Sequence, residues 1–264
     1  MSGGFLETVF VGPAPRIAVT VAGEGPLVLF LHGIGGNRHH WRRQIEFFSQ
    51  RYTAAAMDAR GYGESDDYEG PLQFDHLTDD VLRVCAHFKK TRKMHLVGLS
   101  MGGRIARNVA LHHPEWLLSL TLANTSPGFD ALSAEEVERF VAERKQRTPD
   151  SLRRILGANP RPGVYEELLE SQAALHRESY LKTLEASVAQ DRRAPLEEIR
   201  VRTLVITGSE DSVYPPAMAR DMARRIPGAK LVEIEGAGHL SNLEQPDKFN
   251  AAVLEFLLAE EKHS

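Results

Sequence analysis

The chain has 264 residues, of which 42% are hydrophobic and 26% charged, and its formal net charge is -4 at pH 7. These values are ordinary for a globular protein, and the modest, dispersed charge argues against a nucleic-acid partner or an anionic membrane surface. The N-terminal segment lacks a basic stretch leading into an apolar one, and no apolar run approaches the roughly 18 residues of a membrane span. We therefore expect a cytoplasmic protein, and the sequence does not indicate its oligomeric state.

Short apolar runs alternate with longer amphipathic segments, a pattern typical of strands joined by crossover helices in a mostly parallel sheet. The first strand belongs to a hairpin expected between Phe5 and Val21. The predicted strands are Arg16–Val21, Leu27–Leu31, Thr53–Met57, His95–Leu99, Ser119–Ala123, Thr203–Thr207 and Lys230–Ile234. The predicted helices, which have apolar residues at three and four spacing, are Trp41–Ser49, Phe74–Phe88, Met101–His112, Pro216–Ile226 and Pro246–Leu258. The single cysteine, Cys85, rules out an intramolecular disulfide and fits a buried structural thiol.

The alternation stops between about Ser126 and Arg200, where helical patterns rich in Glu, Arg and Leu follow one another. Proline-containing turns bound this block, which is too short and too charged for an independent core. We predict one α/β core formed by residues 1–126 and 200–264, with residues 127–199 inserted as a helical cap.

A G-x-S-x-G pattern, Gly98-Leu99-Ser100-Met101-Gly102, lies between a predicted strand and a predicted helix. The two glycines permit a sharp turn that projects Ser100 above the sheet, and the N-terminus of the helix directs N–H groups at the same place. Because a serine hydroxyl needs a base, a histidine must lie nearby in space. His239 follows the last predicted strand and precedes the last helix, where loops gather at the carboxyl edge of the sheet.

The acid that orients the base should follow another strand. Asp211 does so in Thr207-Gly208-Ser209-Glu210-Asp211, and we expect the adjacent Glu210 to be a turn or surface residue. The rival position, after the preceding strand, holds Asn124, which cannot stabilise an imidazolium as a carboxylate does. The sequence therefore predicts Ser100, His239 and Asp211 as nucleophile, base and orienting acid.

A glycine-rich loop, Leu31-His32-Gly33-Ile34-Gly35-Gly36-Asn37, follows a predicted strand. The absence of a Gly-Lys-Ser/Thr continuation argues against a phosphate-binding loop. We expect the backbone N–H groups of Ile34 and Met101 to stabilise an oxyanion.

These motifs, with Asp58-Ala59-Arg60-Gly61-Tyr62-Gly63-Glu64-Ser65 and Gly236-Ala237-Gly238-His239-Leu240, resemble the α/β-hydrolase superfamily. The resemblance implies an eight-stranded, mostly parallel sheet flanked by helices and a structural role for Asp58 and Arg60. Within the superfamily, the motif sequences are most similar to those of 3-oxoadipate enol-lactonases and related small esterases. Enzymes that cleave carbon–carbon bonds usually have Pro and Asn where this chain has Gly36 and Leu99.

We expect hydrolysis of a small ester or lactone through an acyl-enzyme, chemistry that needs no metal or organic cofactor. The same three residues can also support carbon–carbon bond hydrolysis, perhydrolysis or cofactor-free oxygen chemistry, and a non-catalytic receptor is a further alternative. The expected substrate contacts are Gly33, His40, Trp41 and Arg104. His39 is a further pocket candidate, and Arg161 and Arg177 are candidates for contacting a carboxylate from the cap. For Arg104, Arg161 and Arg177, a surface or structural salt-bridge role is the favoured alternative.

Overall fold

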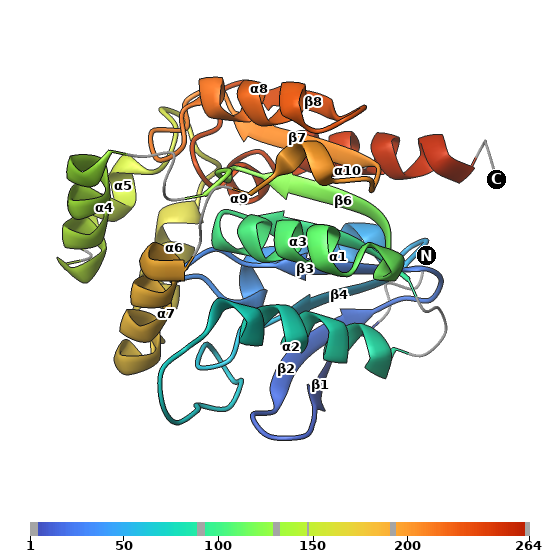
Figure 1. Cartoon of the computed structure of the whole chain (residues 1–264), viewed down its shortest axis with the longest axis horizontal. Coiled ribbons are helices and arrows are strands. Elements are labelled where there is room, and N and C mark those ends of the chain that lie inside the picture. The colour runs from blue at the N-terminus through green and yellow to red at the C-terminus, as the bar shows by residue number, and fades with distance from the viewer. Residues whose placement is uncertain (1–4, 89–92, 129–132, 147, 191–193, 262–264) are drawn as a thin grey trace.

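The computed structural model describes residues 5–88, 93–128, 133–146, 148–190 and 194–261. An eight-stranded sheet forms its centre, in the order β1-β2-β4-β3-β5-β6-β7-β8 (Figure 1). Its strands are β1 (Glu7–Val11), β2 (Ile17–Ala22), β3 (Leu27–Leu31), β4 (Thr53–Met57), β5 (Met94–Leu99), β6 (Leu117–Ala123), β7 (Thr203–Gly208) and β8 (Lys230–Ile234). The β1–β2 and β2–β4 pairs are antiparallel, and the other neighbours are parallel, as predicted.

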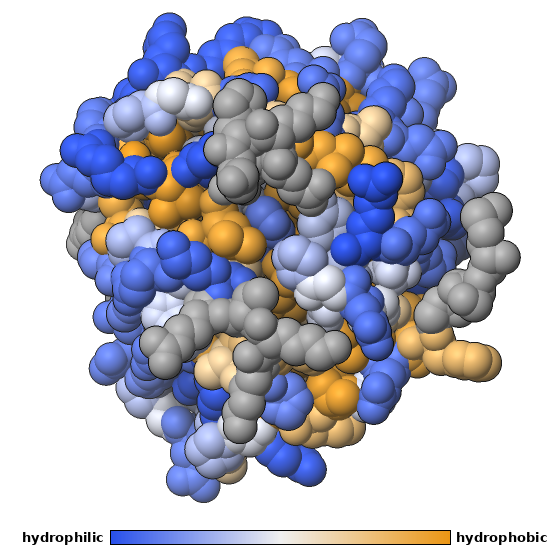
Figure 2. Space-filling model, turned by 90° about the vertical axis from the view of Figure 1, so that its right-hand side faces the viewer, coloured by the Kyte–Doolittle hydropathy of each residue, from blue (hydrophilic) through white to orange (hydrophobic). Residues whose placement is uncertain are grey.

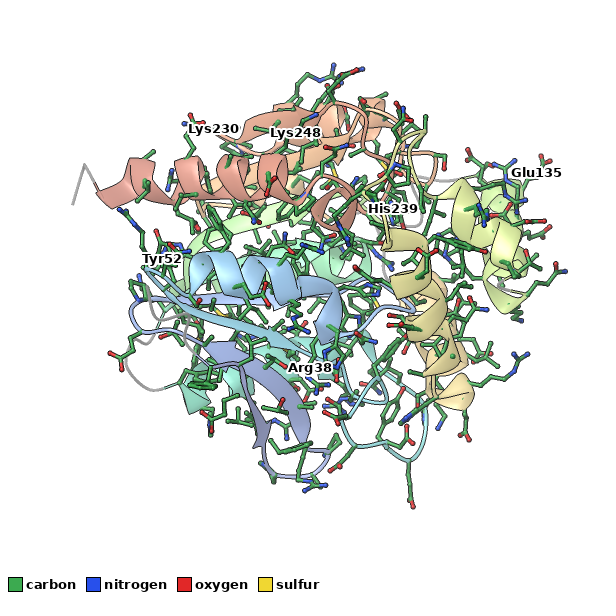
Figure 3. The ribbon with its side chains drawn as sticks, turned by 180° about the vertical axis from the view of Figure 1, so that it is seen from behind. Arg38, Tyr52, Glu135, Lys230, His239 and Lys248 are labelled. Carbon is green, nitrogen blue, oxygen red and sulfur yellow. The ribbon has the colours of Figure 1, made fainter. Side chains whose placement is uncertain are left out.

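Helices cover both faces of the sheet. On one face lie α2 (Phe74–His87), α3 (Met101–His112) and α8 (Pro216–Arg225). On the other face lie α1 (Arg42–Phe48) and α10 (Pro246–Glu261), which are at the front in Figure 3, where the molecule is seen from behind. The short α9 (Ser241–Glu244) precedes α10. The continuous apolar run of β3 follows from this layering, because Leu29 packs in the core on one face and Phe30 in the core on the other.

Between β6 and β7, the described part of the chain forms four α-helices, on the left in Figure 1. They are α4 (Ala134–Gln146), α5 (Pro149–Arg154), α6 (Val164–Ala173) and α7 (Arg177–Gln190). We call these four helices and their connections the insert, and the expected cap boundaries, residues 127 and 199, enclose them. Figure 2 shows the opposite end of the molecule, where hydrophilic side chains separate apolar patches. Among the described residues, no helix is long and apolar enough to cross a membrane.

The predicted elements differ from the observed ones mainly around residue 41. A helix was expected over Trp41–Ser49, but the chain forms a short 3-10 turn, η1 (Arg38–Trp41), before α1. The turn begins early because the Asn37 side chain accepts the His39 N–H at 3.0 Å, which caps it. In contrast, α3 spans Met101–His112 as predicted. Cys85 is buried in the core, and burial raises the pKa of its thiol to about 11.

Candidate active site

Ser100 lies in the sharp turn between β5 and α3. Its φ of 56° and ψ of -114° put a non-glycine residue in the left-handed region, a strained conformation that active sites often hold. The neighbouring glycines permit the turn: a Cβ on Gly98 would lie 2.2 Å from the carbonyl oxygen of Gly102, and one on Gly102 would lie 2.3 Å from the carbonyl oxygen of Leu31. The G-x-S-x-G pattern therefore reflects close backbone packing on both sides of the serine.

The three residues predicted as nucleophile, base and acid form one chain of hydrogen bonds. His239 Nε2 lies 3.0 Å from Ser100 Oγ, and His239 Nδ1 lies 3.1 Å from each carboxylate oxygen of Asp211. All three residues are buried. Since Asp211 follows β7 and His239 follows β8, the parallel strands bring distant segments to one edge of the sheet, and Figure 3 shows His239 beside the insert.

The carboxylate of Asp211 is held from several directions. Its Oδ1 accepts the N–H groups of Val213 and Tyr214 at 2.9 and 3.0 Å, and its Oδ2 accepts the Asn124 amide at 3.0 Å. Burial alone would raise the pKa of Asp211, but the electrostatic interaction with the His239 ring and the hydrogen bonds from His239, Tyr214 and Asn124 lower it below its usual value. Asp211 is therefore an ionised partner for the His239 ring.

Part of the insert is bonded to the loops that carry His239 and Asp211. The His239 N–H donates to Ile155 O at 2.8 Å, and Glu244, the buried last residue of α9, accepts the Gly157 N–H at 2.7 Å and the Gly238 N–H at 3.0 Å. Beside Asp211, Glu210 accepts the Ala158 N–H at 2.6 Å. We call residues 154–158 the anchor turn, because these bonds connect it to both loops.

The glycine loop approaches Ser100 from the other side. A hydrogen bond from Gly36 N to Gly33 O, at 3.0 Å, closes a turn in which Gly35 has a φ of 76°, a conformation that favours glycine. A Cβ on Gly33 would lie 3.1 Å from Ser100 Cβ, so a larger residue would crowd the serine. Ile34 lines the cavity above Ser100, and Met101 is the first residue of α3.

His32, at the start of the glycine loop, has a structural position. Its Nε2 accepts the Ala59 N–H at 3.0 Å, which leaves Nδ1 to donate to Gly33 O at 2.8 Å. Burial lowers the pKa of the His32 ring, so the ring is neutral and can accept and donate in this way. His32 thereby fixes the glycine loop to the segment after β4.

A cavity of about 70 Å³ opens onto Ser100 and His239. Its apolar lining is Ile34, Leu99, Leu152, Ile155, Leu168 and Leu240. Glu143, Arg144 and Ser151 of the insert and His40 of the core add polar groups, and Gly33 contributes its backbone. We call this cavity the active-site pocket. Among the described residues, no group of three or more His, Cys, Asp or Glu side chains is placed to hold a metal ion.

Two of the expected substrate contacts lie elsewhere. Trp41 is buried in the core, where its ring stacks on Phe30 with centroids 5.0 Å apart, so the expectation of a Trp41 contact was wrong. Arg104 is also buried outside the pocket lining, with its guanidinium 5.6 Å from the Phe74 ring centroid and 3.4 Å from Ser187 Oγ. Its position in α3 points it toward α2 and α7 rather than toward Ser100.

Arg161 and Arg177 of the insert lie outside the active-site pocket, which agrees with the favoured surface or salt-bridge role. Arg161 pairs with Glu167 at 2.5 Å outside the pocket lining, and Arg177 borders a different cavity of the insert. The arginine that lines the active-site pocket is Arg144, whose guanidinium lies 3.3 Å from the Phe140 ring centroid. No motif marks Arg144 in the sequence, because its place depends on how α4 packs.

The family match agrees with this architecture. A family model described as the alpha/beta hydrolase family matches residues 28–252, and the chain belongs to that family. The 3-oxoadipate enol-lactonase 2 of Acinetobacter baylyi is 30% identical over 236 residues, covering 87% of this chain and 88% of that protein.

Two other relatives carry different descriptions. A 2-hydroxy-6-oxononadienedioate/2-hydroxy-6-oxononatrienedioate hydrolase of Escherichia coli O139:H28 is 27% identical, covering 96% of this chain and 94% of that protein. The solved structure of a thermophilic esterase from Thermogutta terrifontis is 29% identical and has a TM-score of 0.83, covering 96% of this chain and 98% of the other. The protein is thus a hydrolase-fold chain whose relatives act on different bonds.

Proposed function

We propose that the protein is a serine hydrolase that cleaves small carboxylic esters or lactones, with Ser100, His239 and Asp211 as its catalytic residues. The observation that carries this proposal is the hydrogen-bond chain from Ser100 Oγ through His239 to Asp211, at 3.0 and 3.1 Å, at the base of a largely apolar pocket. Groups arranged in this way can activate a hydroxyl for attack on a carbonyl carbon.

In the proposed reaction, His239 Nε2 takes the proton of Ser100 Oγ as that oxygen bonds to the carbonyl carbon. The resulting oxyanion receives hydrogen bonds from the N–H groups of Ile34 and Met101. When the carbon–oxygen bond to the leaving group breaks, His239 gives its proton to the departing oxygen. A water molecule then loses a proton to His239 and attacks the acyl carbon. The bond from this carbon to Ser100 Oγ breaks and His239 returns the proton to Oγ, which releases the acid and restores Ser100.

The pocket supports a narrower statement about substrates. A largely apolar lining favours a short acyl or lactone carbon skeleton, since burial of each methylene group contributes about 0.8 kcal/mol. The pocket also contains Arg144 and Glu143, whose charges offset each other, so we expect neutral substrates to be preferred over carboxylated ones. The relative named as a 3-oxoadipate enol-lactonase makes a carboxylated enol-lactone the specific candidate to compare.

The test combines a substrate panel with an active-site variant. Purified protein is assayed on 4-nitrophenyl acetate, a neutral enol-lactone, a carboxylated enol-lactone and a vinylogous diketone, alongside Ser100→Ala. We expect turnover of the first two, with Ser100→Ala at least about 10⁴-fold slower and equally stable to heat. Full activity in Ser100→Ala, or cleavage of the diketone alone, would contradict the proposal.

A fluorophosphonate probe separates an enzyme from a binding protein. An activated serine reacts covalently with the probe, whereas an ordinary hydroxyl does not. We expect one adduct on Ser100 by mass spectrometry, and none in Ser100→Ala or His239→Ala. An unlabelled wild-type protein would favour the receptor alternative.

A further inference from the structure

A second, larger cavity lies beside the active-site pocket. It has a volume of about 650 Å³ and extends between the segment of η1 and α1 on the core and α6 on the insert. We call it the side cavity. Its charged lining residues are Arg42, Arg43, Glu46, Glu167 and Glu170. His40 lines both cavities, so the two spaces meet at this side chain.

A buried hydrogen bond closes the boundary between the two cavities. His40 Nε2 lies 2.6 Å from Ser171 Oγ, and the Asn37 amide donates to the same oxygen at 3.3 Å. The Ser171 hydroxyl, which accepts from Asn37, has its own proton to donate to His40. On its other side, the His40 ring is packed against the glycine loop, since a Cβ on Gly36 would lie 2.9 Å from His40 Nδ1. The ring therefore spans the space from the glycine loop to α6.

The chemistry of the walls changes at this boundary. On α6, Leu168 lines the active-site pocket, whereas Glu167, Glu170 and Ser171, on the neighbouring face of the helix, line the side cavity. Three of the charged side chains of the side cavity are in ion pairs: Arg42 bonds to Glu46 at 2.9 Å, and Glu167 bonds to Arg161 at 2.5 Å. A space lined by charges of both signs, several of them in ion pairs, suits an uncharged polar chain better than a hydrocarbon or an ion, because such a chain can hydrogen-bond to the walls without breaking a pair.

We propose that His40 and Ser171 form a partition that limits the length of the substrate, and that opening the partition joins the active-site pocket to a side cavity able to take an uncharged polar chain. This inference rests on the proposed ester or lactone hydrolysis and specifies its substrate range. His40 and Ser171 act on specificity and take no part in bond breaking. The wild-type protein should therefore prefer esters whose chain ends within the first pocket.

The experiment uses three 4-nitrophenyl esters: the acetate, the heptanoate, and the (2-methoxyethoxy)acetate, which matches the heptanoate in chain length but carries two ether oxygens. The measured quantity is the kcat/KM of each long ester divided by that of the acetate. Comparing this ratio between proteins cancels the intrinsic reactivity of each ester. In His40→Ala we expect the ratio for the ether ester to rise at least tenfold over wild type, and that for the heptanoate to rise less than threefold.

Two further variants make the comparison specific. Ser171→Ala removes only the hydroxyl at the boundary, and we expect it to raise the ether-ester ratio about threefold, which preserves the test if His40→Ala does not fold. Glu170→Gln lies in the side cavity beyond the partition and should leave the ratio within twofold of wild type.

The outcomes separate the partition from the proposed function. Serine-dependent hydrolysis with an unchanged ratio in both partition variants would overturn the partition alone. An equal rise for the heptanoate and the ether ester would overturn the polar character assigned to the side cavity. Absence of ester hydrolysis in the wild-type protein would overturn both the proposed function and this inference.

Discussion

The side-chain amide of Asn124 donates one hydrogen bond to Asp211 Oδ2, at 3.0 Å, and another to Gly238 O, at 3.1 Å. Asn124 thus connects the carboxylate beside His239 with the residue that precedes His239 in the chain. Ser241 in turn donates to Asn124 Oδ1 at 2.5 Å. The position that could hold a rival acid instead holds an amide that orients Asp211.

Replacing Asn124 should slow the reaction while leaving substrate binding nearly intact. Its φ of 45° lies in the left-handed region, so Asn124→Gly removes the amide without straining the backbone. A hydrogen bond to a charged group contributes about 1.5–3 kcal/mol, so we expect kcat to fall roughly 10- to 100-fold at constant KM. Steady-state kinetics check this, with Ser241→Ala, which keeps both amide bonds, as the milder control. Equal effects in the two variants would contradict the role given to Asn124.

Asp211→Asn should lower kcat by about 10⁴-fold, because a neutral amide cannot stabilise the imidazolium and favours the wrong tautomer of His239. The neighbouring Glu210→Gln is the matched control, since Glu210 accepts the Ala158 N–H and does not contact the ring. We expect the control to retain activity within tenfold in the same ester assay. A reversed order of the two variants would move the acid to Glu210.

The pH dependence of stability should depend on His95. This ring lies in β5 with Nδ1 2.8 Å from Ser119 Oγ, and burial, together with the charge of Arg202, lowers its pKa from 6.5 to about 4. Between pH 6.5 and pH 4, the His95 ring is protonated in the unfolded chain but neutral in the folded protein. The contribution of His95 to the free energy of unfolding is therefore full above pH 6.5 and is lost as the pH falls toward 4. Between pH 7 and pH 5, wild type should lose roughly 2 kcal/mol more than His95→Asn. Urea unfolding at both values measures this difference, and equal losses would contradict it.

Gly98→Ala should prevent the turn around Ser100 from forming. The added Cβ would lie 2.2 Å from Gly102 O, a backbone atom that moves only if α3 moves. We expect a loss of about 3 kcal/mol or more in the free energy of unfolding, together with loss of activity. Gly12→Ala, where no atom lies within 4 Å of the added Cβ, should change stability by less than about 0.5 kcal/mol. Thermal unfolding of both variants measures these changes in stability, and a Gly98→Ala variant as stable as the wild-type protein would contradict the packing argument.

Glu244→Ala should destabilise both the fold and the active site. Its carboxylate accepts the N–H groups of Gly157, Gly238 and Leu240, at 2.7, 3.0 and 3.0 Å, and each orphaned buried donor costs about 1–3 kcal/mol. We expect a loss of about 3–5 kcal/mol in chemical unfolding, with lower kcat. Glu167→Ala breaks a more exposed ion pair with Arg161 and should cost less than about 1 kcal/mol. Similar losses in the two variants would show that the buried position of Glu244 is unimportant.

The sheet and the proposed catalytic residues could be predicted because local sequence determines them. Helix α3 begins at Met101 because the glycines fix the turn before it, and Asp211 and His239 follow apolar strands. Arg104 was expected to face the substrate because it follows Ser100 by four residues, the spacing of one helix face. Ser100, however, precedes α3 and has a positive φ, so its side chain does not lie on the same helix face as that of Arg104. Arg144 and Ser171 belong to the insert, whose packing against the core depends on tertiary contacts that no short motif encodes.

The anchor turn, residues 154–158, constrains how the protein can be recombined with its relatives. In chain order it belongs to the insert, but the Ile155 carbonyl accepts the His239 N–H, and the Gly157 N–H donates to Glu244. A chimera that exchanges residues 127–199 as a block would replace backbone groups that hold the proposed catalytic residues, along with the walls of the pocket. Grafts confined to α4, or to α6 and α7, would change the walls of the pocket and leave these backbone groups in place. New substrate ranges should therefore be sought by piecewise exchange on either side of the anchor turn.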